Sequence, residues 1–151
     1  MNQVRSQLFG PLDRISVVIM SKGGGDEMTG RTLVVEDDPL VRLQIVDALE
    51  ALGQLALEAG NAKDALDLLE GGATICHLVT DIRMPGCTDG LALARIVLER
   101  WPAINVVVAS GRRSDEVDLP SAATFLSKPF GLRALMIALE QSAHCDVPIT
   151  A

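Results

Sequence analysis

The fold is decided by one stretch of eight residues, TLVVEDDP at positions 32–39. Its first half, residues 32–35, is apolar enough to form a buried β-strand, and the acidic triplet that follows ends that strand. Asp38 is a good N-cap residue, and Pro39 suits the first position of a helix. The stretch therefore predicts a strand that turns directly into a helix, which is the repeating unit of an α/β fold.

The same unit recurs along the rest of the chain. Strands are expected at residues 55–58, 78–80, 105–109 and 124–126, and helices at about 39–52, 61–70, 91–100 and 132–142. The strands are almost continuously apolar, which is typical of a parallel sheet covered by helices on both faces. The sequence predicts a five-stranded, doubly wound α/β domain. The first and last helices are expected to bury the apolar stripes Leu40, Leu43, Val46 and Leu49, and Leu132, Leu135, Met136 and Leu139.

Composition and charge exclude several classes of protein. The chain has 151 residues, 48% of them hydrophobic, and a net charge of −7, so we expect one compact acidic domain that does not bind nucleic acid. The apolar runs are too short for a membrane span or a secretory signal. The three cysteines form no C-x-x-C pair, which favours reduced thiols and a cytoplasmic location. Residues 1–29 are expected to be an N-terminal extension with little fixed structure, with a strand at residues 15–20 as the alternative, and residues 144–151 a C-terminal tail.

Chemically useful side chains follow four of the predicted strands. Glu36 and Asp37 follow the first strand, Asp81 ends the third, Ser110 ends the fourth, and Lys128 follows the fifth. Ligands of open α/β sheets bind at the carboxyl ends of the strands, so these groups are expected to converge there. Carboxylates packed within a few Å of each other repel and require a cation. Oxygen ligands with room for water suit Mg²⁺.

Four ordered motifs carry a resemblance to a known family. They are VVEDDPLVR at 34–42, TDIRMPG at 80–86 with Asp89 and Gly90 after it, ASG at 109–111 and SKPF at 127–130. Together they resemble the receiver domain of two-component response regulators, over about residues 30–143. The resemblance implies a flavodoxin-like fold with strand order 2-1-3-4-5. It also implies transfer of a phosphoryl group from a histidine kinase or a histidine phosphotransfer protein to an aspartate.

The resemblance assigns roles to individual residues. Asp81 corresponds to the phosphoacceptor, Ser110 to the switch hydroxyl, Lys128 to the cation that pairs with the phosphoryl group, and Phe125 to the switch aromatic residue. Mg²⁺ would be held by Asp37 and Asp81 directly, by Glu36 through water, and by the backbone carbonyl of Arg83. Such a protein catalyses only its own phosphorylation and dephosphorylation and is not otherwise an enzyme.

Three departures from the family pattern are visible. The loop from Asp81 to Gly90 is one residue longer than usual, and Phe125 lacks the hydroxyl of the commoner tyrosine. Between Ser110 and Lys128 the chain is shorter by about one helical turn, and Pro120 interrupts it. The fourth helix of the fold is therefore predicted to be short or absent, as in some stand-alone receivers.

The leading hypothesis is a single-domain response regulator that switches an unidentified protein partner, as a monomer or weak dimer without membrane contact. Few residues follow the last predicted helix, so no output domain is expected. The alternative is a degenerate receiver that acts as a binding or dimerisation module independently of phosphorylation. A phosphohydrolase is disfavoured, because Ile82 and Arg83 follow Asp81 where such an enzyme needs a second aspartate.

Overall fold

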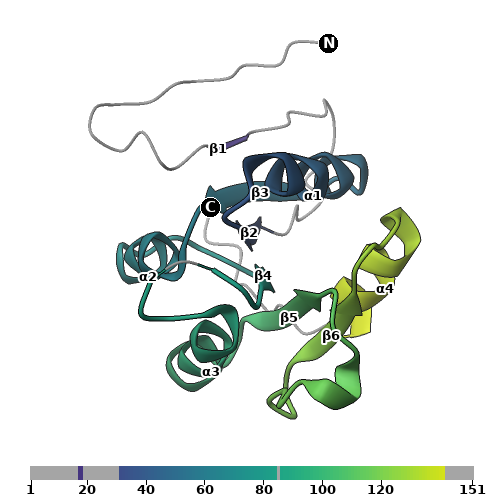
Figure 1. Cartoon of the computed structure of the whole chain (residues 1–151). Helices are drawn as coiled ribbons and strands as arrows, with labels where there is room; N and C mark the ends of the chain where they lie inside the picture. The colour runs from purple at the N-terminus through teal and green to yellow at the C-terminus, as the bar shows by residue number, and fades with distance from the viewer. Residues whose placement is uncertain (1–16, 19–30, 85, 142–151) are drawn as a thin grey trace.

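The computed structural model describes residues 17–18, 31–84 and 86–141 (Figure 1). Its centre is one sheet in the order β1-β3-β2-β4-β5-β6. The strands are β1 Val17–Val18, β2 Arg31–Val35, β3 Leu55–Ala59, β4 His77–Asp81, β5 Asn105–Ser110 and β6 Thr124–Ser127. All neighbours from β3 to β6 pair in parallel. Counted among these five parallel strands alone, the order is 2-1-3-4-5, so the predicted flavodoxin-like fold is confirmed.

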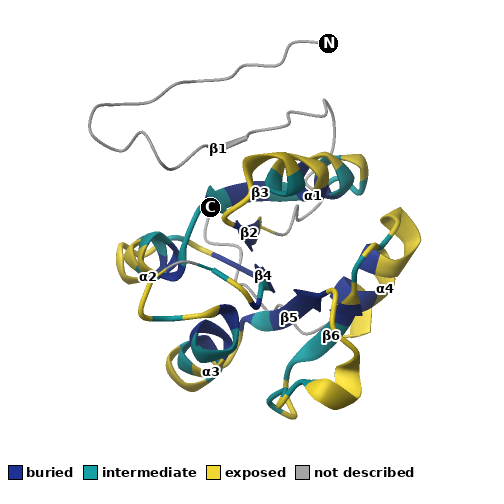
Figure 2. Ribbon diagram, in the orientation of Figure 1, coloured by how far each residue is buried: buried dark blue, intermediate teal, exposed yellow. Residues whose placement is uncertain are grey.

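Two helices cover each face of the sheet. The helices are α1 Pro39–Ala51, α2 Ala62–Glu70, α3 Gly90–Arg100 and α4 Leu132–Gln141. Residues of α2 and α3 share one apolar core cluster with Leu33 and Leu78, and residues of α1 and α4 share a second with Val34 and Val79. Figure 2 shows the buried residues in the strands and on the sheet-facing sides of the helices. No helix in the described part of the chain combines the length and apolarity needed to cross a membrane.

The helix starts agree with the capping residues in the sequence. Asp38 caps α1, and its Oδ1 accepts a hydrogen bond from the N–H of Leu40 at 2.9 Å. Asn61 caps α2 through the N–H of Asp64 at 2.8 Å. After α1 the chain turns at Gly53, whose φ of 78° lies in the left-handed region that glycine tolerates. The predicted strand–turn–helix unit at residues 32–39 is therefore present.

The predicted apolar stripes of α1 and α4 are partly wrong. Leu40 is 72% exposed and Leu43 43% exposed, whereas α1 buries Ile45, Val46 and Leu49. On α4, Leu132 and Met136 are exposed, and the buried residues are Leu135, Ala138 and Leu139. On α1 the predicted positions are three residues apart, and each such step advances about 300° around a helix, so a row of four drifts by about 180° and cannot stay on one face. On α4 the predicted positions do share one side of the helix, but the buried face is rotated toward Ala138 and away from Leu132 and Met136.

A short strand from the N-terminal segment joins the edge of the sheet. β1 pairs antiparallel with β3, with Val17 opposite Leu57 and Val18 opposite Ala56. For residues 1–29 we expected an extension with little fixed structure, with a strand at residues 15–20 as the alternative. The structure has a strand at Val17 and Val18. Pairing covers backbone groups of β3, which would otherwise be the exposed edge. The rest of residues 1–29, and the C-terminal tail at 144–151, lie outside the described residues.

The fourth helix of the fold is reduced, as predicted. Between β5 and β6 the chain forms only the three-residue 3₁₀ helix η1, Ser114–Glu116. The helix α4 follows β6 and is therefore the last helix of the fold, not the reduced one. Val117 and Leu119 pack against the α2–α3 side of the core. Arg95 of α3 holds the same segment through an ion pair with Asp118 at 3.1 Å. This segment starts directly after Ser110 and forms one wall of the site described below.

The state of the cysteines differs from the prediction. Cys76, the residue before β4, is disulfide-bonded. Cys87, in the loop after β4, is a free, exposed thiol. The prediction was based on the absence of a C-x-x-C pair, on the odd number of cysteines and on the lack of an export signal, none of which tests a given cysteine for a bond. The expectation of reduced thiols is therefore wrong for Cys76.

Candidate functional site

The parallel strands bring the predicted site residues to one edge of the sheet. Asp81 ends β4 opposite Ala109 of β5, and Ser110 ends β5 opposite Ser127 of β6. The strand pairing continues past the strand ends: the N–H of Glu36 donates to the carbonyl of Ala59 at 3.1 Å, and the N–H of Lys128 donates to that of Ser110 at 2.8 Å. These backbone hydrogen bonds thus fix the positions of the Glu36 and Lys128 backbones, from which their side chains extend.

Three carboxylates form the centre of the site. Oxygens of Glu36, Asp37 and Asp81 all lie within 4.8 Å of one another. Glu36 is only 2% exposed, whereas Asp37 faces solvent. Burial raises the pKa of the Glu36 carboxyl above its ordinary value, and the charge of Asp81 adds to this effect, while hydrogen bonds from Lys128 and from the N–H of Asp38 oppose it. The cluster therefore favours binding a proton or a cation.

Lys128 is the ammonium group that faces this cluster. Its Nζ lies 3.0 Å from Oε2 of Glu36 and 3.5 Å from Oδ1 of Asp81. The Lys128 side chain is 23% exposed and that of Glu36 3%, so the pair is well shielded from water. One ammonium leaves the three carboxylates with an excess of negative charge. An oxygen-only donor set with this excess, open to solvent at Asp37, fits a hard divalent cation such as Mg²⁺.

Asp81 is held closely by the elements around it. Its Oδ1 accepts a hydrogen bond from the N–H of Ile82 at 2.8 Å. Gly90, the first residue of α3, donates its N–H to the carbonyl of Ile82 at 2.8 Å. A Cβ added at Gly90 would lie 1.7 Å from the carbonyl oxygen of Asp81. The helix end can approach the candidate acceptor this closely only with glycine, a requirement that sequence reasoning missed.

Ser110 lies at the end of β5 and Phe125 within β6, and neither belongs to the acidic cluster. Ser110 is buried, and its Oγ accepts a hydrogen bond from the N–H of Arg112 at 3.1 Å. Phe125 is half-buried on β6, opposite Val108 of β5. The Ser110 hydroxyl therefore connects the end of β5 to the start of the segment that contains η1.

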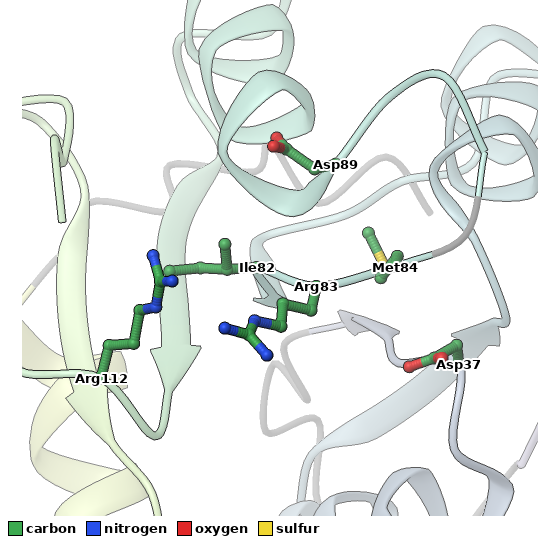
Figure 3. Close-up of a pocket in the computed structure, with 6 residues that line it drawn as sticks. All are labelled: Asp37, Ile82, Arg83, Met84, Asp89 and Arg112. Carbon is green, nitrogen blue, oxygen red and sulfur yellow. The ribbon is translucent and has the colours of Figure 1, made fainter.

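An open cavity of about 510 Å³ adjoins the cluster. Figure 3 shows it between the loop after β4 and the end of β5, with the guanidinium groups of Arg83 and Arg112 extending into the same space. Both arginine side chains are exposed. The other lining residues are Asp37, Ile82, Met84 and Asp89. Only the backbone carbonyl of Arg83 was predicted to take part in the site, and in the structure its side chain also lines the cavity.

Comparison with known proteins identifies a family. The model of the response regulator receiver domain matches residues 32–140. The response regulator receiver protein CpdR of Brucella abortus is 35% identical over 115 residues, which cover 74% of this chain and 94% of CpdR. The sensor kinase CckA of the same organism is 34% identical over 114 residues, 72% of this chain but only 12% of the kinase.

The chain is also similar in structure to a response regulator solved with bound ligands. The response regulator protein TrrA of Thermotoga maritima, solved in complex with Mg²⁺ and BeF, superposes with a TM-score of 0.68 at 26% identity. The match covers 76% of this chain and 99% of TrrA.

Proposed function

Because the chain belongs to the family of response regulator receiver domains, we propose that it is a phosphorylation switch in which Asp81 accepts the phosphoryl group. The observation that carries the proposal is the cluster of Glu36, Asp37 and Asp81, with Lys128 beside it, at the carboxyl edge of the sheet. A histidine kinase or a histidine phosphotransfer protein supplies the phosphoryl group. The similarity to a sensor kinase and to a receiver protein supports this class of donor.

The acidic cluster would hold one Mg²⁺ ion. Glu36, Asp37 and Asp81 offer oxygens within 4.8 Å of one another, and the backbone carbonyl of Arg83 completes the proposed set. The complex of TrrA with Mg²⁺ and BeF supports this choice of ion. When bound, Mg²⁺ neutralises charge on the phosphoryl oxygens and reduces repulsion between the donor and the carboxylates.

Asp81 is the proposed nucleophile. Its Oδ1 accepts the hydrogen bond from Ile82 and faces Lys128, and among the described contacts Oδ2 has no hydrogen-bond partner. Oδ2 attacks phosphorus, a new P–O bond forms an acyl phosphate, and the bond between phosphorus and the donor's imidazole nitrogen breaks. Lys128 pairs with a phosphoryl oxygen and compensates charge that develops in the transition state. The chain thus catalyses only its own modification.

The signal would leave the site through Ser110. In the unphosphorylated state its Oγ accepts a hydrogen bond from the N–H of Arg112. Donation of the hydroxyl proton to a phosphoryl oxygen moves Ser110 toward Asp81 and pulls on the segment that contains η1. Phe125 then adjusts by packing alone, because it has no hydroxyl to form a new hydrogen bond. A protein partner that binds one of the two arrangements more tightly reads the change.

Phosphorylation by a small donor tests the proposal. The full chain is incubated with acetyl phosphate and Mg²⁺, and the intact mass is measured. We expect one labile phosphoryl group on the wild type and none on Asp81→Asn. Asp89→Asn is the matched control, because Asp89 is a carboxylate lining the same cavity and the amide oxygen can still accept from the N–H of Ala92.

Each other result of this test points to a different function. A phosphate that persists on Asp81→Asn contradicts the acceptor assignment. A wild-type chain that takes up no phosphate, with Mg²⁺ present, supports a module that binds independently of phosphorylation. Continuous release of inorganic phosphate over many turnovers supports a phosphohydrolase.

A further inference from the structure

Arg42 connects three elements around the acidic turn. It lies one turn into α1, and its Nη1 donates to the backbone carbonyl of Glu36 at 2.8 Å. Its Nε donates to Oε1 of Glu58, on the neighbouring strand β3, at 3.2 Å. The side chains of Arg42 and Glu58 are only 21% and 14% exposed, so water competes little for these contacts. One guanidinium therefore ties α1 and β3 to the residue that follows β2.

The carbonyl that Arg42 holds determines the direction of Asp37. It belongs to the planar peptide between Glu36 and Asp37, so fixing its orientation also fixes the N–Cα bond from which Asp37 starts. On the other side, Asp38 is anchored as the N-cap of α1. Within the described residues, no hydrogen bond or ion pair holds the Asp37 carboxylate itself. Its position therefore depends on the backbone on either side of it.

Charge alone does not account for arginine at this position. Glu58 compensates the charge of Arg42, so the pair adds no net charge to the site. The N-terminal end of a helix also favours anions over cations, which makes arginine an unfavourable choice near the start of α1. Residues that are unfavourable for their local secondary structure are most often found at functional sites. The planar guanidinium has the property required here, since it bonds a carboxylate and a carbonyl at once in fixed directions.

We propose that Arg42 is a positioning residue for the cation site, holding the Glu36 carbonyl so that Asp37 points into the acidic cluster. Glu58 keeps the guanidinium in the required orientation. The inference rests on the proposed function, in which Asp37 is a ligand of Mg²⁺. Partners one shell away from a metal ligand commonly change metal affinity by about 10- to 100-fold when they are removed.

Calorimetric titration of the unphosphorylated full chain with MgCl₂ tests the proposal. Arg42→Met keeps an unbranched side chain as far as the position of the arginine Nε and removes both donors, and we expect the Kd for Mg²⁺ to rise about tenfold or more. A purely electrostatic role predicts the opposite sign, since loss of a cation near the site would tighten Mg²⁺ binding. Arg42→Met/Glu58→Gln preserves the net charge and is expected to be weakened as well. Arg42→Lys keeps the charge without the planar fork and carries the test if Arg42→Met does not fold.

Arg95 provides the matched control. Like Arg42, it bonds both a carboxylate and a backbone carbonyl, with Nη2 donating to Oδ2 of Asp118 at 3.1 Å and to its carbonyl at 3.0 Å. Arg95→Met should lower the thermal midpoint slightly and leave the Kd for Mg²⁺ unchanged. If Arg42→Met and Arg42→Lys bind Mg²⁺ as tightly as the wild type or more tightly, the positioning role is overturned and the proposed function is unaffected. A wild-type chain that binds no Mg²⁺ overturns the proposed cation site and the inference together.

Discussion

Replacement of Gly90 by alanine should damage both stability and phosphorylation. The added methyl would lie 1.7 Å from the carbonyl oxygen of Asp81, 2.6 Å from its carbonyl carbon and 2.8 Å from Cα of Ile82. All three are backbone atoms of the chain leaving β4, so no flexible side chain can move aside. The start of α3 must shift away from the sheet and lose the hydrogen bond from the N–H of Gly90 to Ile82.

The size of the effect follows from the terms involved. Overpacking typically costs about 1–3 kcal/mol, the lost hydrogen bond adds about 1 kcal/mol, and the better helix propensity of alanine returns up to about 1 kcal/mol. We expect a loss of about 1–3 kcal/mol in the free energy of unfolding, or a decrease of about 3–10 °C in the thermal midpoint. Because the backbone of Asp81 itself moves, phosphorylation by acetyl phosphate should also slow.

Urea unfolding and intact-mass kinetics measure the two effects. Gly131→Ala is the matched control, because a Cβ at Gly131 meets no atom within 4 Å and φ there is not positive. Gly131 is the residue before α4, where alanine is a poorer N-cap than glycine, so this control should lower the free energy of unfolding by about 1 kcal/mol at most and leave the phosphorylation rate unchanged. A Gly90→Ala protein with wild-type stability and a wild-type phosphorylation rate would refute the close approach of α3 to Asp81.

Three further predictions concern pH and mobility. Burial raises the pKa of Glu36, so without Mg²⁺ the folded chain keeps the Glu36 proton to higher pH than the unfolded chain does. The thermal midpoint should therefore fall as pH rises from about 4.5, and Glu36→Gln should remove this fall. Burial lowers the pKa of His77 below its ordinary value of 6.5, so the unfolded chain binds a proton on this residue more readily than the folded chain does. The free energy of unfolding should therefore decrease as pH falls from 6.5 toward the lowered pKa, and His77→Gln should abolish that decrease. Beryllofluoride with Mg²⁺ should increase the protection of residues 111–123 against amide exchange, and equal protection in both states would exclude this segment as the switch.

The part of the fold that could be predicted is the part encoded locally. The strand, cap and helix start at residues 32–39 are adjacent in sequence, and Asp38 and Pro39 act within one turn of each other. The candidate site was also predictable, because parallel topology brings every strand end to the same edge. Asp81, Ser110 and Lys128 are distant in sequence, yet each is placed by its position at the end of a strand or directly after one.

The remainder depends on contacts that local patterns do not contain. Nothing near Gly90 in the sequence reveals that the carbonyl of Asp81 occupies the space where a Cβ would lie. Arg42 reads as an ordinary polar residue of a helix until Glu58 and the Glu36 carbonyl are seen around it. The apolar run at residues 15–20 allowed a strand but did not require one, and the pairing of β1 is set by the free edge of β3 that it meets.

Charge balance gives the arginines that line the cavity, Arg83 and Arg112, a role beside the acidic cluster. Three carboxylates and the ammonium of Lys128 leave two negative charges, which one divalent cation would balance. Phosphorylation of Asp81 replaces a monoanion by a group that carries nearly two charges, so one negative charge remains uncompensated. The guanidinium groups of Arg83 and Arg112 extend into the cavity that adjoins the acidic cluster. Both are exposed, so salt screens their attraction to the phosphoryl group. The lifetime of the acyl phosphate should therefore depend on ionic strength more strongly than the Mg²⁺ affinity of the proposed site at the buried Glu36 does.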